Sequence, residues 1–175
     1  MKKKMYFLLF SLFVSCSTLI QAKDGTVHFS GDIINSPCVV ATESKNQIIN
    51  LGQIAVIKLI NGGVSTPKPF QIILEDCSIE YTQSSPILAI SFTGEGDIHA
   101  PELISLMGTG SAKNVAIELL DYKGEHISLN GKITITQDVK QHQNILNFSA
   151  RYRNTTEVPL SGHANGVTDF NIIYK

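Results

Sequence analysis

The feature that most constrains the fold is a succession of short apolar runs separated by turn-forming residues. The runs are rich in Val, Ile, Phe and Tyr, and the segments between them carry Gly, Asn, Ser and Pro. Short strands at this spacing are typical of an antiparallel sandwich or barrel, so we expect one all-β domain. The predicted strands cover residues 25–34, 47–51, 70–76, 87–92, 115–121, 133–136, 144–152 and 168–174. One short helical segment is predicted, at residues 55–60 or at residues 101–107.

The charge balance excludes one broad class of partner. Charged residues make up 17% of the 175 residues, and the formal net charge is −1. A nucleic-acid-binding protein needs a basic surface, and no such excess of Lys and Arg is present. We therefore expect no nucleic-acid partner.

The first 22 residues have the pattern of a secretory signal peptide. Three lysines are followed by an apolar run over residues 5–14 and then by a small residue, Ala22. The run is too short for a permanent transmembrane helix, which needs about 20 residues. We expect cleavage after Ala22, which leaves a soluble, exported chain that begins at Lys23. The alternative is lipoprotein processing at Cys16, although the residues before it suit that reaction poorly.

Removal of the signal peptide leaves two cysteines, Cys38 and Cys77. An oxidising compartment favours their pairing in one intramolecular disulfide. Closing a loop of about 40 residues stabilises a fold by about 4 kcal/mol in the chain-entropy model. The alternatives are two free thiols or a bond between chains.

The sequence contains no local motif for catalysis or metal binding. The five histidines, at positions 28, 99, 126, 142 and 163, are scattered and form no pair at metal-ligand spacing. Glu75 and Asp76 are adjacent on a predicted strand, so their side chains point to opposite faces. We therefore expect neither an enzyme nor a protein with a metal, a cofactor or a small-molecule substrate.

The stretch at residues 25–34 alternates as a strand does, with Val27, Phe29, Gly31 and Ile33 on one face. Such alternation predicts a strand with one buried face. The glycine is unexpected, because glycine inside a strand costs about 0.5–1 kcal/mol. On the residues alone, the simpler interpretation is the first strand of the chain's own sheet.

Five short motifs resemble those of chaperone–usher fimbrial subunits, most closely type 1 major pilins. They occur in order along the whole mature chain. They are Gly-Thr-Val-His-Phe-x-Gly at 25–31, Asn-Leu-Gly-Gln at 50–53, Leu-x-x-Cys at 74–77, Ala-Arg-Tyr at 150–152, and an ending with Gly162, Ala164, Asn165, Phe170, Ile172 and Tyr174. The chain departs from the family at residues 154–157, where a glycine is often found, and at Lys175.

The resemblance implies an incomplete immunoglobulin-like sandwich, completed by a donor strand from a neighbouring subunit. Residues 23–35 would be the amino-terminal donor extension, and residues 36–175 the pilin domain. Val27, Phe29 and Ile33 would insert as knobs. Gly31 would match a shallow place in the groove.

The same resemblance assigns a role to the end of the chain. Phe170, Ile172 and Tyr174 would form the strand at the groove edge, which a periplasmic chaperone recognises by pairing with it. An unpaired strand edge is prone to aggregation, which explains why such a subunit needs a chaperone.

The implied function is that of a structural subunit in a type 1-like pilus on the cell surface, used for adhesion. Its partners would be a periplasmic chaperone, an outer-membrane usher and neighbouring subunits, which join by donor-strand exchange. The alternatives are a minor adaptor or terminator subunit and a small adhesive binding module.

Overall fold

The computed structural model describes residues 25–31, 33, 36–78, 87–131, 135–156 and 158–174. The chain divides into two units, residues 1–34 and 35–175, and the second is the folded domain. The predicted signal peptide and Cys16 lie outside the described residues. Within the part that is described, no helix has the length and apolar character needed to cross a membrane.

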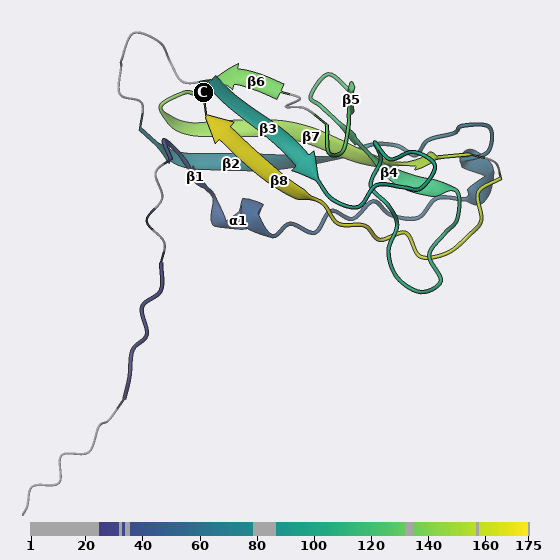
Figure 1. Cartoon of the computed structure of the whole chain (residues 1–175), viewed down its shortest axis with the longest axis horizontal. Helices are drawn as coiled ribbons and strands as arrows, with labels where there is room; N and C mark the ends of the chain where they lie inside the picture. Colours follow the sequence, from purple (N-terminus) through teal and green to yellow (C-terminus); the bar gives the residue numbers. More distant parts are fainter. Residues whose placement is uncertain are drawn as a thin grey trace, which may run out of the picture. The chain divides into compact units, whose positions relative to one another are not determined.

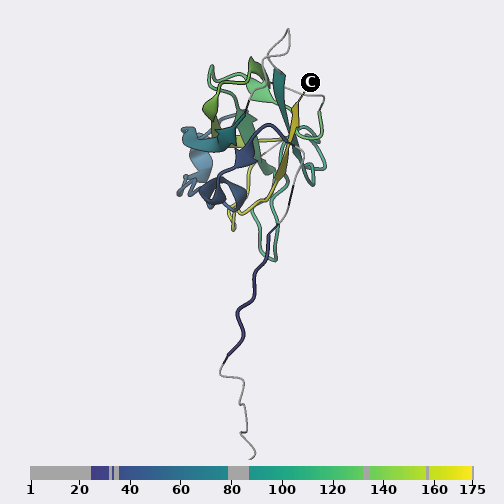
Figure 2. The same ribbon diagram turned by 90° about the vertical axis from the view of Figure 1, so that its left-hand side faces the viewer.

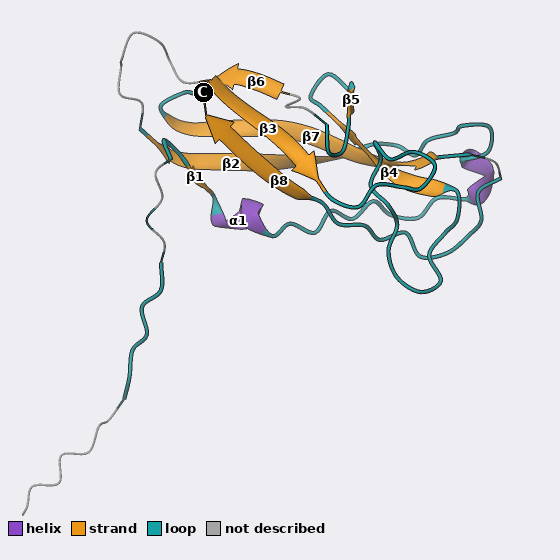
Figure 3. Ribbon diagram, in the orientation of Figure 1, coloured by secondary structure: helices purple, strands orange, loops and turns teal. Residues whose placement is uncertain are grey.

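The folded domain consists of two antiparallel sheets with very little helix (Figures 1 and 3). A five-stranded sheet has the order β1-β2-β7-β4-β5, and a three-stranded sheet has the order β6-β3-β8. The strands are β1 (Val39–Val40), β2 (Lys68–Cys77), β3 (Ile87–Thr93), β4 (Val115–Leu120), β5 (His126–Ile127), β6 (Ile135–Asp138), β7 (His142–Asn154) and β8 (Asp169–Tyr174). The helical segments are α1 (Thr42–Lys45) and the 3-10 helix η1 (Val56–Lys58).

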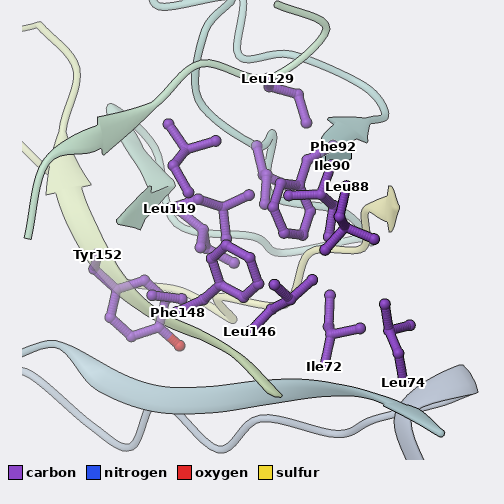
Figure 4. Close-up of a cluster of buried hydrophobic side chains, with 14 of the residues drawn as sticks. Ile72, Leu74, Leu88, Ile90, Phe92, Leu119, Leu129, Leu146, Phe148 and Tyr152 are labelled. Atoms are coloured by element: carbon purple, nitrogen blue, oxygen red, sulfur yellow. The ribbon is translucent and has the colours of Figure 1, made fainter. Parts of the chain in front are cut away.

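The hydrophobic core lies between the two sheets and is centred on three aromatic rings. Phe70 on β2 and Phe148 on β7 are register partners, with ring centroids 5.4 Å apart. Phe92 on β3 meets the Phe148 ring edge-on at 5.2 Å, and so connects the second sheet to the first. Figure 4 shows aliphatic side chains around this group, among them Ile72, Leu88 and Leu146. Alternation of buried and exposed residues along β7 orients this strand toward the core.

Most of the strand predictions are confirmed. The predicted runs at 70–76, 87–92, 115–121, 144–152 and 168–174 correspond to β2, β3, β4, β7 and β8. The run predicted at 133–136 corresponds to β6, which begins at Ile135, and residues 133–134 lie outside the described residues.

Other local predictions were wrong. Residues 47–51 form no strand, because no neighbouring strand pairs with them. Residues 101–107 form a turn and isolated bridges, whereas the segment at 55–60 does contain η1. The sequence also gave no signal for β1, β5 or α1, because elements of two to four residues show no hydrophobic period.

The structure also corrects one interpretation of residues 25–34. Its described residues, 25–31 and Ile33, belong to no strand. The side chains of Val27, Phe29 and Ile33 are 75%, 93% and 105% exposed. The simpler interpretation of this stretch as the first strand of the chain's own sheet is therefore wrong.

The predicted intramolecular disulfide between Cys38 and Cys77 is confirmed. It joins the segment before β1 to the end of β2, and both residues are buried. The buried Asn144 side chain lies beside it, with Nδ2 3.2 Å from Cys77 Sγ and 2.8 Å from the Lys140 carbonyl oxygen. The free-thiol and interchain alternatives do not apply.

The five-stranded sheet also carries a buried carboxylate, at Glu118 on β4. Arg151 Nε donates to Oε2 at 2.6 Å, and Arg153 donates to Oε1 at 2.5 Å. Burial alone would raise the pKa of Glu118, but the hydrogen bonds and positive charges of the two arginines lower it below its ordinary value of 4.5. Glu118 and Arg151 are direct cross-strand partners, so this ion pair stabilises the β4–β7 register.

We predict that Glu118→Gln destabilises the domain by about 1–3 kcal/mol at pH 7, because charged hydrogen bonds are lost while the arginines are partly solvated. The pKa of this carboxylate is lower in the folded state than in the unfolded state. Its contribution is therefore present above pH 4.5 and is lost as the pH falls below that value. Urea unfolding followed by circular dichroism at pH 7 and at lower pH measures the difference.

The matched control is Glu125→Gln, which changes an exposed carboxylate in the hairpin that follows β4. We expect this control to have the stability of the parent chain at both pH values. If the loss of stability caused by Glu118→Gln stays the same as the pH falls from 7 to below 4.5, the assigned ion pair is contradicted.

Candidate functional site

The candidate site begins with β8, which is an outer strand of its sheet. Within the described residues β8 pairs with β3 alone, and the two strands lie side by side in both views (Figures 1 and 2). The backbone groups on its other side therefore have no ladder partner in this part of the chain. An unpaired edge of this kind is a template for pairing with another strand.

The hydrophobic core is incompletely covered along this edge. The β3 side chains Leu88, Ile90 and Phe92 are at most 2% exposed. Their register partners on β8 pack against the same core but are only half-buried; they are Tyr174, Ile172 and Phe170. The side of β8 away from β3 therefore lacks the cover that β3 receives.

The far end of β8 is held beside the disulfide. Burial raises the pKa of Tyr174, and a hydrogen bond with Ser36 partly offsets this effect. Ser36 Oγ also donates to the Cys38 carbonyl oxygen at 2.8 Å. These contacts place the end of the groove-edge strand next to the first residues of the folded domain.

A second segment, residues 47–54, forms one wall of the candidate site. It is connected to β2 by the Gln47 side chain, whose Nε2 donates to the Gln71 carbonyl oxygen at 2.6 Å. Leu51 and Ile54 are half-buried and pack against the core. Gly52 has a φ of 76°, a left-handed conformation that glycine adopts without strain. Its N–H donates to Asn50 Oδ1 at 2.9 Å.

A cavity of about 780 Å³ lies between residues 47–54 and residues 159–166, which lead toward β8. Its floor is part of the hydrophobic core and includes Leu59, Val115, Ile117 and Tyr152. Burial raises the pKa of Tyr152, so its hydroxyl is neutral at physiological pH. The hydroxyl donates to the Ala164 carbonyl oxygen at 3.0 Å and so connects the floor to the wall. Figure 4 shows Tyr152 within the same cluster of buried side chains as Phe148 and Leu146.

Two glycines allow the 159–166 wall to approach its neighbours closely. A Cβ at Gly162 would lie 2.4 Å from the Ala112 nitrogen and 2.6 Å from the Gly110 oxygen. A Cβ at Gly166 would lie 2.9 Å from Ile117 Cδ1, on the cavity floor. Backbone bonds hold the wall in place, since the Ala112 N–H donates to the His163 oxygen and the His163 N–H donates to the Gly110 oxygen.

The predicted site residues fall into two sets. Phe170, Ile172 and Tyr174 are half-buried residues of the outer strand β8, and their role as groove-edge residues stays a prediction. Val27, Phe29 and Ile33 are largely exposed, and a Cβ at Gly31 would have no atom within 4 Å. Nothing in the chain's own fold therefore requires glycine at position 31.

Sequence reasoning missed the cavity itself. The motifs at 50–53 and 162–165 fall on its two walls, so they marked the right segments without showing that these face each other. The described residues hold no group of three His, Cys, Asp or Glu side chains suited to a metal ion. The site is a groove with an apolar floor beside an outer strand edge.

Comparison with known proteins places the chain in a family. The model of the fimbrial protein family matches residues 27–175. The chain is 37% identical to the probable major fimbrial subunit LpfA of Escherichia coli O157:H7, over 99% of this chain and 97% of that one. It is also 37% identical to the long polar fimbria protein A of Salmonella typhimurium, with the same coverage of both chains. The chain belongs to the fimbrial protein family.

A solved structure agrees with the fold. The crystal structure of the P pilus rod subunit PapA matches with a TM-score of 0.69 at 23% identity, over 80% of this chain and all of that one. The prediction of an all-β, immunoglobulin-like sandwich is therefore confirmed. Family membership confirms the prediction of a structural fimbrial subunit rather than an enzyme.

We predict that Gly162→Ala destabilises the domain by about 1–3 kcal/mol, the usual cost of overpacking, because the new Cβ meets fixed backbone atoms. Urea unfolding of the mature chain, followed by circular dichroism, measures the change. The control is Ser161→Ala at the neighbouring exposed position, which should leave stability unchanged. Equal stability of the two variants would contradict the close approach at Gly162.

Proposed function

We propose that the mature chain polymerises head to tail, each copy inserting its amino-terminal arm, residues 23–35, into the groove of the next copy. The observation that carries the proposal is the half-buried row Phe170, Ile172 and Tyr174 beside an unpaired strand edge. One additional strand on that edge would cover the row and pair its backbone. The arm supplies a segment with matching alternation and no role in its own domain.

The exposed state of the arm supports the donor role. Val27, Phe29 and Ile33 expose most of their apolar surface to water. Burial of a large apolar side chain contributes about 1.5–3 kcal/mol, so three contribute about 5–9 kcal/mol before ordering costs. Gly31 then has a physical reason, since glycine permits a close backbone approach to the groove of another copy.

The direction of insertion follows from the sheet. Every pair of strands among the described residues is antiparallel. An arm that pairs antiparallel with β8 runs from Tyr174 toward residues 159–166. This direction brings Ile33 to the 780 Å³ cavity, which has an apolar floor able to receive it.

The geometry of such a joint yields a filament. Each copy gives one strand and accepts one, which is a heterologous contact that generates an open chain of subunits. We propose that the filament is a surface fimbrium used for adhesion, reached through the periplasm after removal of residues 1–22. The relatives named as major fimbrial subunits support a role in the filament body.

An unfilled groove needs protection before assembly. Strand addition by a chaperone to a pilin is an established form of β-augmentation. We propose that a periplasmic chaperone covers the β8 edge of this chain and that an outer-membrane usher presents it for exchange. A role as a minor adaptor or terminator uses the same groove, and a small adhesive module would instead bind its ligand there.

We predict that the mature chain, co-expressed with its chaperone and usher, gives SDS-resistant multimers on an unboiled gel of surface-sheared material. Deletion of residues 23–34 should reduce the ladder to monomer. Phe29→Asp should do the same, because it places a charge on the face that enters the apolar groove. Ser30→Asp is the matched control on the opposite face of the arm, and it should retain the ladder.

Monomer from the parent chain would contradict a polymerising subunit and favour a terminator or an adhesive module. An unchanged ladder from the deletion variant would show that subunits join by another surface. If Ser30→Asp loses the ladder as Phe29→Asp does, this would argue against insertion of the Phe29 face of the arm alone.

A further inference from the structure

Two aliphatic side chains next to the cavity are exposed although they do not line it. Ile57 on η1 is 70% exposed, and Val158 is 59% exposed. Each adjoins a residue that lines the cavity, Val56 in the first case and Pro159 in the second. We call Ile57 and Val158 the rim residues, because each is the sequence neighbour of a lining residue and neither lines the cavity itself.

The backbone of both rim residues is well held. In η1 the Leu59 N–H donates to the Val56 oxygen at 2.9 Å, and Leu59 itself is buried in the core. The Val158 carbonyl oxygen accepts a hydrogen bond from Asn114 Nδ2 at 3.0 Å. The backbone at these two positions is consequently held by the folded domain.

The length of the arm limits where the body of a donor copy can lie. Only two residues separate Ile33 from Ser36. Three extended residue steps span at most about 11 Å. In the proposed direction of insertion Ile33 occupies the cavity, so Ser36 of the donor must lie within that distance of it. The donor's disulfide-bonded end must then lie against the rim.

We propose that Ile57 and Val158 form a second contact with the next copy of this chain, outside the groove, against its Pro37 and Val39. Pro37 follows Ser36 directly and is half-buried, and Val39 is 37% exposed. Both follow the tether at once, so they are the first apolar side chains of the donor body to reach the rim. This contact rests on the proposed strand exchange and adds a body-to-body interface to it.

The test compares two complexes of the same acceptor. The chaperone-bound mature chain is allowed either to join with other full chains or to bind excess synthetic peptide of residues 23–35, which carries an arm but no body. The dissociation temperature in SDS is measured for each product. The double variant Ile57→Gln/Val158→Gln should lower the dissociation temperature of the subunit joint and leave that of the peptide complex unchanged.

Ile145→Gln is the matched control, because Ile145 is 44% exposed on β7 and does not line the cavity. It should change neither complex. Val39→Gln in the donor should lower the dissociation temperature of the subunit joint, as the double variant does. If the double variant lowers the dissociation temperature of both complexes equally, or of neither, the second contact is overturned while strand exchange stays intact. Failure of the parent chain to form either complex would overturn the strand exchange and this contact together.

Discussion

The structure depends on one deficiency, which is that β8 pairs with a strand on only one side within the described part of the chain. The β3 side chains Leu88, Ile90 and Phe92 are buried, whereas their register partners Tyr174, Ile172 and Phe170 on β8 are only half-buried. The unpaired backbone edge is a template for a further strand, and the row of half-exposed apolar side chains is unfavourable in water. Together they define the requirement for one more strand with alternating apolar residues.

The other parts of the domain are closed by their own contacts, so the β8 edge is where a further strand would fit. The Phe70–Phe92–Phe148 cluster connects the sheets at their centre, and the disulfide closes one end. Glu118 is paired with Arg151 and Arg153 on β7, so the charge buried on the larger sheet is satisfied. The cavity near residues 159–166 has part of the hydrophobic core as its floor, whereas its walls carry both polar and apolar side chains.

The sequence predicts the regular parts of this fold because period-two alternation records burial. Alternation is clear along β7, whereas β4 is buried along its whole length and was recognised as an apolar run bounded by turn-forming residues. The two cysteines left one intramolecular pairing. The segment at 47–51 has apolar residues yet forms no strand, since strand formation depends on a partner that a single sequence does not reveal. The arm at 25–34 shows the same limit, because its alternation indicates a strand but not whose sheet it joins. The cavity could not be predicted, because its walls are far apart in sequence and meet through the tertiary fold.

The central claim is that the arm of one copy occupies the groove of another, and a structure of the assembled filament tests it most directly. The account predicts that residues 27–33 of one copy lie between β8 and residues 47–54 of the next, antiparallel to β8. Ile33 should fill the cavity, and Phe170, Ile172 and Tyr174 should be buried. A filament in which the arm packs on its own domain, or in which the β8 edge stays unpaired, would contradict the account.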